Sequence, residues 1–461
     1  MPLGNLTGAL GKKRAAHLLR RTSFGASIAD IDLFAGLTAQ EAFDRLLSED
    51  LPDPPLPLDL ATNSEWVLSG TSDANSENFD LSRFLNTWMI GQALGSDISN
   101  DLKPSWSFRE RMVFFFHTLF TTKHTSVNSS RAIYYQQALF RKYAFDRDDR
   151  SRVNPESTEE EPLPDIPIFV NLRELTKKVC VDNAMLVFLD GRLNVRGNPN
   201  ENFARELLEL YSIGRGLEGN VPDPEFDGDY HYFTEQDVQE AAKVLSGFNF
   251  DENFRYNQDP NAIRNYGDPD TELPRGILRG DSLVASQHDN TTKQFSVRFG
   301  GATIEPNSDL YINGFPSEES VLDEIGQLVD LIYDQDQTTI NICRRIYRFF
   351  VYHEVTPELE ADIIQELADI FRANDFKLHY VLEALFTSEH FYEGSAGYTD
   401  DSFGGLIKSP YDLVVGFHKN MNLALPEYTV GNLVSYYEDY AGPMNSQMSA
   451  QGMDFYDPFE V

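Results

Sequence analysis

Apolar residues recur every three to four positions along most of this chain, which is the spacing of helices that bury one face. Such runs occupy 10–21, 84–94 and 132–145, and they return in series between 318 and 421. Ser/Thr-x-x-Asp/Glu motifs, which satisfy the first turn of a helix, precede several of the runs. The pattern therefore predicts a mainly α protein, built as one large multi-helix body.

Breaks in this periodicity divide the chain. Two long stretches are rich in Pro, Ser, Asn and acidic residues, which favour loops. A third abounds in Gly, Asn, Asp and aromatic residues and predicts a loop-rich insert containing a few short β-strands. The predicted units are a helical body at 1–247 with loops at 48–80 and 146–168, the irregular insert at 248–312, C-terminal helices on the same body at 313–425 and an extended tail at 426–461.

Residues 112–120 form the most hydrophobic segment of the chain. Because a helix here would be apolar around its whole circumference, it should run through the middle of the body. His117 would then be buried. A lone histidine in an apolar helix is more often a satisfied core residue than a metal ligand.

A helix-like run at 200–210 separates its charged residues from its apolar ones. The charged residues lie within about 140° of the circumference, and they are Glu201, Arg205, Glu206 and Glu209. The opposite face is apolar, and it consists of Phe203, Leu207, Leu210 and Tyr211. The charged face could be a solvated stripe, a buried ion-pair network, or a metal or acid/base site.

A catalytic interpretation needs partners from elsewhere. The candidates are Asp237 and Glu240 in the next predicted helix, His288 and Asp289 in the insert, and His117. Carboxylates and histidines on facing helices build metal centres, but the Glu-x-x-His pair of di-iron sites is missing from 200–214. A mononuclear divalent metal site and a metal-free carboxylate pair fit equally well.

The acidic loop after 222 has oxygen-bearing side chains at alternate positions and a glycine at its sixth position. This matches the first half of a calcium-binding loop. The candidate ligands are Asp223, Glu225, Asp227 and Asp229. The twelfth position is Thr234 instead of an acid, which favours a solvated acidic turn over calcium.

The formal net charge of -35 argues against nucleic acid and anionic membrane surfaces as partners. No stretch has the roughly 20 apolar residues of a membrane span, and the N-terminus does not have the order of a secretory signal. Cys180 and Cys343 lie in apolar helical contexts, so we expect small core residues and no disulfide.

Several stretches, in order along nearly the whole chain, resemble the bacterial family catalogued as domain of unknown function 1800. They are 16–25 (AHLLRRTSFG), 109–117 (RERMVFFFH), 189–191 (LDG), 200–210 (NENFARELLEL), 232–247 (YFTEQDVQEAAKVLSG), 287–289 (QHD), 344–351 (RRIYRFFV), 385–391 (LFTSEHF) and 407–410 (IKSP). The resemblance implies a mostly helical protein that is exported to the periplasm, cell surface or exterior. It also implies a protein partner from a neighbouring sulfatase-like family.

Two departures from the family pattern matter. Leu119 stands where the family tends to have a second histidine, which weakens any metal site at His117. The sequence also ends inside what resembles the family's final motif, so we expect the true C-terminus to lie beyond Val461.

Two hypotheses follow. The first is an envelope or extracellular enzyme, hydrolase-like, that uses a metal or paired carboxylates on the 200–210 face. The second is a non-enzymatic component of a surface or secretion-linked assembly, in which the same residues form a structural lock. An open pocket in front of Glu201, Glu206 and Glu209 would favour the enzyme, and closed ion pairs would favour the lock.

Overall fold

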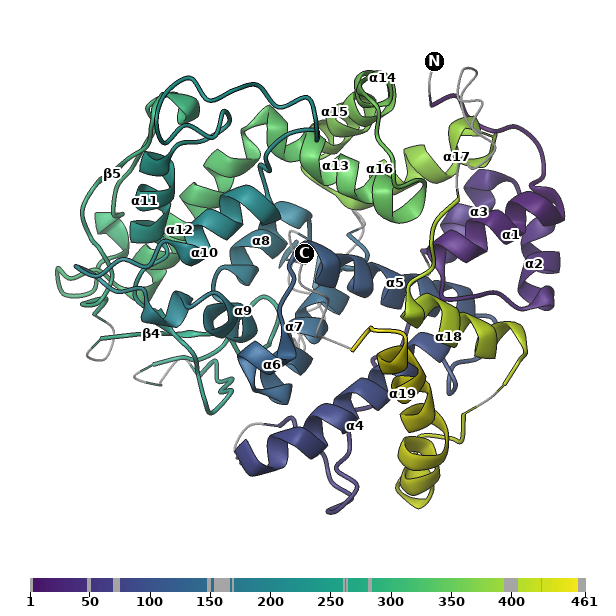
Figure 1. Cartoon of the computed structure of the whole chain (residues 1–461). Coiled ribbons are helices and arrows are strands. Elements are labelled where there is room, and N and C mark those ends of the chain that lie inside the picture. The colour runs from purple at the N-terminus through teal and green to yellow at the C-terminus, as the bar shows by residue number, and fades with distance from the viewer. Residues whose placement is uncertain are drawn as a thin grey trace, which may run out of the picture.

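The structure, a computed structural model, is built mainly of α-helices that surround a central helix (Figure 1). This confirms the predicted fold class. The residues that it describes are 3–47, 51–68, 75–146, 151–152, 166–167, 170–259, 262, 264–280, 284–393, 405–423 and 425–454.

The chain opens with three short helices, α1 (Gly11–Thr22), α2 (Ile28–Ala35) and α3 (Ala39–Leu46). Capping boxes begin the second and third. Ser27 and Thr38 each accept a hydrogen bond from the backbone N–H three residues on, and the acid at that position accepts one in return. The sequence motifs therefore mark these two helix starts correctly.

The predicted apolar helix is α5 (Lys103–Leu119), which lies near the middle of the molecule. It packs between α4 (Asn75–Leu94) and α7 (Ser130–Tyr143), and nearly all of its side chains are buried, His117 among them. The prediction of a buried central helix is confirmed. The predicted loop at 48–80 ends earlier than expected, because α4 already begins at 75.

The C-terminal helices pack on the same body. Residues from Leu3 to Phe391 contribute to one continuous hydrophobic core, which four long helices complete. These are α12 (Glu318–Tyr333), α13 (Asp336–Phe350), α15 (Gln365–Ala373) and α16 (Leu378–Phe386).

The insert holds two antiparallel strand pairs. β3 (Phe248–Asn249) pairs with β4 (Ile277–Leu278), and β5 (Lys293–Gln294) pairs with β6 (Thr303–Ile304). A third pair joins β1 (Ser151–Arg152) to β2 (Ile166–Pro167), inside the predicted loop at 146–168; most of that loop lies outside the described residues.

The prediction of an extended tail at 426–461 is wrong for its described part. Residues there form η7 (Ser435–Ala441) and α19 (Gly442–Ala450), which pack against α4 and α18 (Pro410–Asn420). Tyr436, Met444 and Met448 are buried in a second hydrophobic core. Burial of these side chains against α4 stabilises helices that have little periodicity of their own.

The remaining elements are short and connect these layers. They are α6 (His124–Val127), α8 (Leu172–Val179), α9 (Asn183–Phe188), η1 (Gly191–Leu193), α10 (Asn202–Glu206), η2 (Leu207–Tyr211), α11 (Glu235–Val244), η3 (Val297–Phe299), η4 (Ser308–Leu310), α14 (Pro357–Leu359), η5 (Glu360–Ile364), α17 (Glu389–Glu393) and η6 (Val430–Asn432).

Candidate functional site

The polar helix at 200–210 is α10 continued by η2, a single turn of π-helix. The wider turn rotates the residues that follow it relative to an α-helix. Leu208 is consequently buried, whereas Leu210, predicted on the apolar face, is 49 % exposed. Phe203, Leu207 and Tyr211 are buried as predicted.

Arg205 ties this helix to α11. Its guanidinium donates to both carboxylate oxygens of Glu235 at 2.7 and 3.0 Å, to Tyr230 Oη at 2.9 Å and to Glu201 at 3.4 Å. The hydrogen bonds from Arg205 hold the pKa of Glu235 at about 2, and those to Glu235 raise the pKa of Arg205. The side chains of the pair are about one-third exposed. Arg205 thus acts as a clamp at the surface between two helices.

Glu209 and Glu206 lie farther along the same face. Arg215 makes an ion pair with Glu209 at 2.5 Å. Glu206 is half-buried, and burial together with the charge of Glu209 raises its pKa. Neither of the two cavities described below is lined by these residues or by Glu201. On this face, salt bridges thus occupy Arg205 and Glu209.

Asp237 is fully buried and fully bonded. Its carboxylate accepts hydrogen bonds from the backbone N–H and hydroxyl of Thr234, and from the N–H and hydroxyl of Ser296 at 2.7 and 2.6 Å. It caps α11 and fastens the insert to it. Glu240, one turn on, accepts from Lys243 at 2.6 Å. These contacts give Asp237 a structural role, and its catalytic role stays a prediction.

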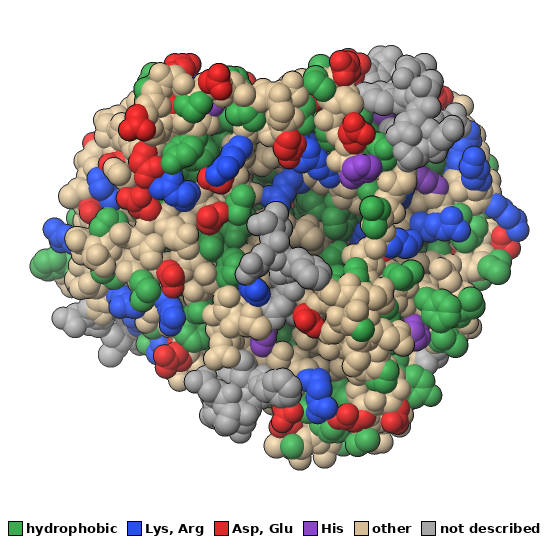
Figure 2. Space-filling model, viewed as in Figure 1, with side chains coloured by type: hydrophobic (Ala, Val, Ile, Leu, Met, Phe, Trp, Pro, Cys, Tyr) green, Lys and Arg blue, Asp and Glu red, His purple; other side chains and the backbone are tan. Residues whose placement is uncertain are grey.

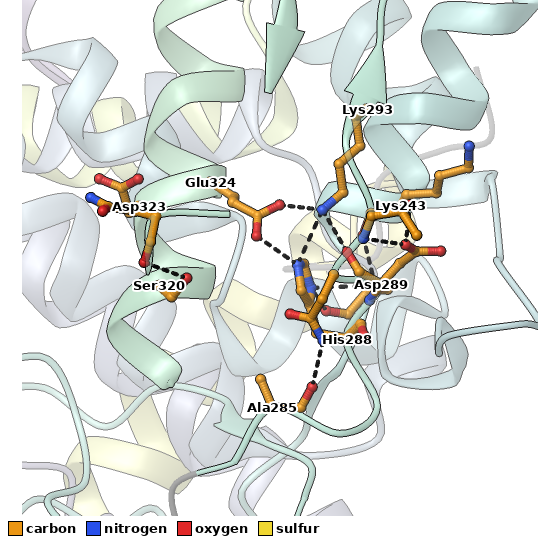
Figure 3. A network of polar contacts seen from close by, with 12 residues as sticks. Lys243, Ala285, His288, Asp289, Lys293, Ser320, Asp323 and Glu324 are labelled. Carbon is orange, nitrogen blue, oxygen red and sulfur yellow. Dashed lines mark hydrogen bonds and ion pairs between the residues drawn. The ribbon is translucent and has the colours of Figure 1, made fainter. Parts of the chain in front are cut away.

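His288 belongs to a buried polar network that holds the insert against α12 (Figure 3). Its Nδ1 contacts the carbonyl of Ser246 at 2.8 Å, and its Nε2 contacts Glu324 at 3.3 Å. Lys293, also buried, makes an ion pair with Glu324 and donates to the backbone carbonyl of Asp289. The Asp289 side chain accepts hydrogen bonds from the backbone N–H and the hydroxyl of Thr291. Sequence reasoning missed Lys293 and Glu324, because neither stands in a recognisable motif.

No group of three or more His, Cys, Asp and Glu side chains that could hold a metal occurs in the described part of the chain. His117 is buried inside α5, with Gln137 Nε2 3.5 Å from its Nδ1. Burial lowers the pKa of His117 to about 4, so its imidazole is neutral at pH 7. The predicted divalent metal ligands His117, His288 and Asp289 are therefore not assembled into one site.

In the acidic loop, the guanidinium of Arg298 contacts two of the carboxylates that were predicted as calcium ligands. Arg298 donates to Asp229 at 2.8 and 3.2 Å and lies 3.3 Å from Glu225. Asp223 and Asp227 are exposed to solvent. The carboxylate of Asp229 thus already forms an ion pair with a cation, and the hydrogen bonds from Arg298 lower its pKa. This supports the solvated, salt-bridged turn.

A cavity of about 630 Å³ opens instead where α1, α5, α13 and α18 meet. Figure 2 shows the hollow, with Lys, Arg and His side chains around it, near the middle of the visible face. Its lining is basic and aromatic, and it consists of Lys13, His17, Arg20, Arg21, Arg111, Phe114, Thr118, Arg348, Phe349, Gly405, Leu406, Ile407, Lys408, Ser409 and Asp412. A second cavity, of about 20 Å³, is large enough only for water.

Two glycines allow the walls of this basic pocket to meet. Gly25, just after α1, has φ +145°, and a Cβ there would lie 3.0 Å from the Cα of Gly416 in α18. A Cβ on Gly416 would in turn lie 2.8 Å from the carbonyl oxygen of Phe24. The close backbone approach brings the end of α1 against α18.

Four of the six cations in the basic pocket make no ion pair with a carboxylate of the described residues, although the charge of Asp412 acts on Arg21 and Lys408. Arg111 pairs with Asp412, and Arg348 pairs with Glu218 at 2.5 and 3.0 Å. The four that remain are Lys13, Arg20, Arg21 and Lys408. Such a concentration of positive charge is notable in a chain with a net charge of -35, and it attracts anions.

The pKa values show that these cations repel one another. Burial and then the charge of Arg111 lower the pKa of Arg21 to about 10, against the opposite effect of Asp412. Burial lowers the pKa of His17 to about 4, helped by Arg21, Arg20 and Lys13. The Nε2 atom of His17 is buried and has no hydrogen-bond partner in the structure described. Buried polar atoms are normally satisfied by protein, water or a ligand, so His17 Nε2 leaves one hydrogen-bonding position open beside the cations.

The cations of the basic pocket come from four stretches that carry the family resemblance, except for Lys13. Arg20 and Arg21 lie in 16–25, Arg111 in 109–117, Arg348 in 344–351 and Lys408 in 407–410. The usable sequence signal is the run Arg109-Glu110-Arg111 directly before the apolar segment 112–120, because buried charges need a partner or a ligand.

A family model described as "Protein of unknown function (DUF1800)" matches residues 17–461. Neither the curated proteins nor the solved structures gave a match. Among the described residues, none of the helices is long and apolar enough to cross a membrane.

Proposed function

Because the chain belongs to the DUF1800 family, whose description gives no activity, we propose its function from the basic pocket: it binds a small anionic ligand there. The observation that carries this proposal is the set of four cations without carboxylate partners among the described residues, gathered in one cavity. At about 630 Å³, the cavity lies within the usual range for ligand sites.

The pocket offers two kinds of anion donor. Arg20, Lys13 and Lys408 are exposed at its rim, where their charges attract an anion from solvent. Arg21 and Arg111 lie deeper, and a guanidinium can donate two parallel hydrogen bonds to a phosphate, sulfate or carboxylate. Asp412 and the rings of Phe349 and Phe24, at 4.5 and 5.3 Å, hold the Arg111 guanidinium in place. Little side-chain entropy is therefore lost when it binds an anion.

Isothermal titration with inorganic phosphate at low ionic strength tests this proposal. We expect Arg20→Gln combined with Lys408→Gln to weaken phosphate binding by about tenfold or more, since each charge-assisted hydrogen bond contributes roughly 1.5–3 kcal/mol. Both side chains are exposed, so the variant should fold.

The control for this experiment is Lys12→Gln. Lys12 is also an exposed cation of α1, but it pairs with Asp32 at 2.6 Å and does not line the pocket. Its removal should leave phosphate affinity unchanged. Absence of phosphate binding to the unaltered chain, or equal losses in the two variants, would refute the proposal.

A second proposal concerns the Glu/Arg face. We propose that Glu201, Arg205, Glu206 and Glu209 stabilise the fold as a lock, in agreement with the non-enzymatic hypothesis. The closed contacts of Arg205 with Glu235 and of Glu209 with Arg215 support it. Export and a sulfatase-like protein partner stay predictions. Cell fractionation and co-purification with the tagged chain test them, and a cytoplasmic protein without that partner would contradict both.

A further inference from the structure

The lining of the basic pocket divides into two chemical parts. The cations of α1 and Lys408 form one part, and four apolar side chains form the other: Phe114, Phe349, Leu406 and Ile407. A site for an inorganic anion needs only the first part. The apolar part therefore calls for a separate explanation.

Phe114 and Phe349 present a rigid aromatic wall to the cavity. Both are half-buried, whereas their chain neighbours Phe115 and Phe350 are fully buried. The two exposed rings lie 5.9 Å apart at 55°, and Phe349 is packed against Phe115 and Phe350 at 5.2 and 4.8 Å. Because these core contacts fix the wall, an apolar group could pack on it with little loss of side-chain freedom.

Leu406 and Ile407 add apolar surface to the lining of the pocket. Ile407 is fully exposed, and Leu406 beside it is half-buried. Their neighbour Lys408 is one of the unpaired cations. A charged group and a large apolar surface thus adjoin within three consecutive residues.

The size of the cavity also favours a ligand with an apolar part. At about 30 Å³ per water molecule, a volume of about 630 Å³ corresponds to roughly 20 waters. An oxyanion of five heavy atoms would leave most of this space in contact with water, together with the parts of the aromatic wall that Arg111 does not cover. A larger ligand that covers the wall gains the burial of apolar surface.

We infer that the ligand is a phosphate monoester of an aromatic or aliphatic alcohol, with its phosphate on the cations and its apolar part on the Phe114 and Phe349 wall. This inference rests on the proposed anion-binding function. A phosphomonoester carries a charge of about -1.5 to -2 at pH 7. Four unpaired cations therefore favour it over the single charge of a sulfate ester or a carboxylate.

The test compares phenyl phosphate with methyl phosphate on the whole chain by isothermal titration. The two anions bear similar charge and differ in the ring. We expect phenyl phosphate to bind about tenfold more tightly, because stacking on the aromatic wall buries a ring face. Phenyl sulfate, which keeps the ring and loses charge, should bind more weakly than phenyl phosphate.

Two variants locate the effect. Phe349→Leu and, separately, the fully exposed Ile407→Ser should reduce the preference for phenyl over methyl phosphate. Because the Phe349 ring also holds Arg111, Phe349→Leu should weaken inorganic phosphate binding as well, whereas Ile407→Ser should leave it unchanged. The second variant changes no buried group and should fold. Phe226→Leu, an exposed aromatic outside the pocket, is the control and should change neither affinity.

The outcomes separate this inference from the proposed function. If inorganic, methyl and phenyl phosphate all fail to bind, the anion-binding function itself is refuted. If methyl and phenyl phosphate bind equally, the apolar part of the ligand is refuted while anion binding stands. If phenyl sulfate binds as tightly as phenyl phosphate, the choice of a phosphate ester is refuted.

Discussion

The buried ion pair between Lys293 and Glu324 gives a quantitative test of how the insert is held on the helical body. Both side chains are completely buried, and His288 contacts the same carboxylate (Figure 3). The perturbation is Lys293→Met, which keeps an unbranched side chain and removes the charge. It leaves Glu324 buried with only the His288 contact at 3.3 Å.

The expected loss is large because a buried charge without its partner cannot be solvated. Removal of one member of such a pair typically costs about 3–5 kcal/mol, whereas an apolar replacement of both is often neutral. In the double variant Lys293→Met with Glu324→Leu, His288 Nε2 and the backbone carbonyl of Asp289 each lose a partner, and each loss costs about 1–3 kcal/mol. The double variant should therefore lose less free energy of unfolding than the sum of the losses in the two single variants.

Urea unfolding measures these differences. Circular dichroism follows the helices of the whole chain. Fluorescence follows Trp66, Trp88 and Trp106, which lie in the N-terminal third of the sequence. If the insert detaches before the body unfolds, the two transitions will separate in the single variant. The control is Lys12→Met at the exposed pair with Asp32, where the loss should stay below about 1 kcal/mol.

Either of two results would refute this reasoning. If Lys293→Met costs no more than Lys12→Met, then Lys293 and Glu324 do not form a desolvated pair. Additive losses in the double variant would likewise show that the two side chains do not depend on each other.

Two further predictions concern pH. The folded pKa of Glu235, about 2 against an ordinary 4.5, means that its pair with Arg205 stabilises the fold above pH 4.5 and stops doing so as pH falls toward 2. Glu235→Gln should thus lower stability at pH 7 by less than about 1 kcal/mol, since the pair is partly exposed, with a narrowing difference in urea titrations at lower pH. His17, whose pKa falls from 6.5 to about 4, should take up protons when phosphate neutralises Arg21, Arg20 and Lys13. Titrations between pH 4 and 6.5 in buffers of different ionisation enthalpy should show this uptake, and its persistence in His17→Gln would contradict the assignment.

The pattern of apolar residues was sufficient for most of the helices. The capping motifs at Ser27 and Thr38 and the apolar segment of α5 are local signals, because a helix satisfies its own backbone hydrogen bonds within a few residues. The pattern was insufficient at α19, whose helix depends on burial of Met444 and Met448 against another part of the chain.

For the 200–210 helix, too, the sequence predicted one part of the arrangement and the structure supplied the rest. Its sequence placed the charges on one face, and the structure keeps them there. The partners of those charges, Glu235 for Arg205 and Arg215 for Glu209, come from other parts of the chain. The π-turn at η2, which exposes Leu210, also has no signature in the residue pattern.

By itself, the sequence determined that this protein is mainly helical, acidic and built on a central apolar helix. Only the tertiary structure decided where positive charge is concentrated. The cations of the basic pocket run from Lys13 to Lys408, and their positions depend on how α1, α5, α13 and α18 pack. Periodicity reports which face of each helix is buried, but electrostatic potential depends on distances between charges in space. Those distances exist only once the helices have been brought together.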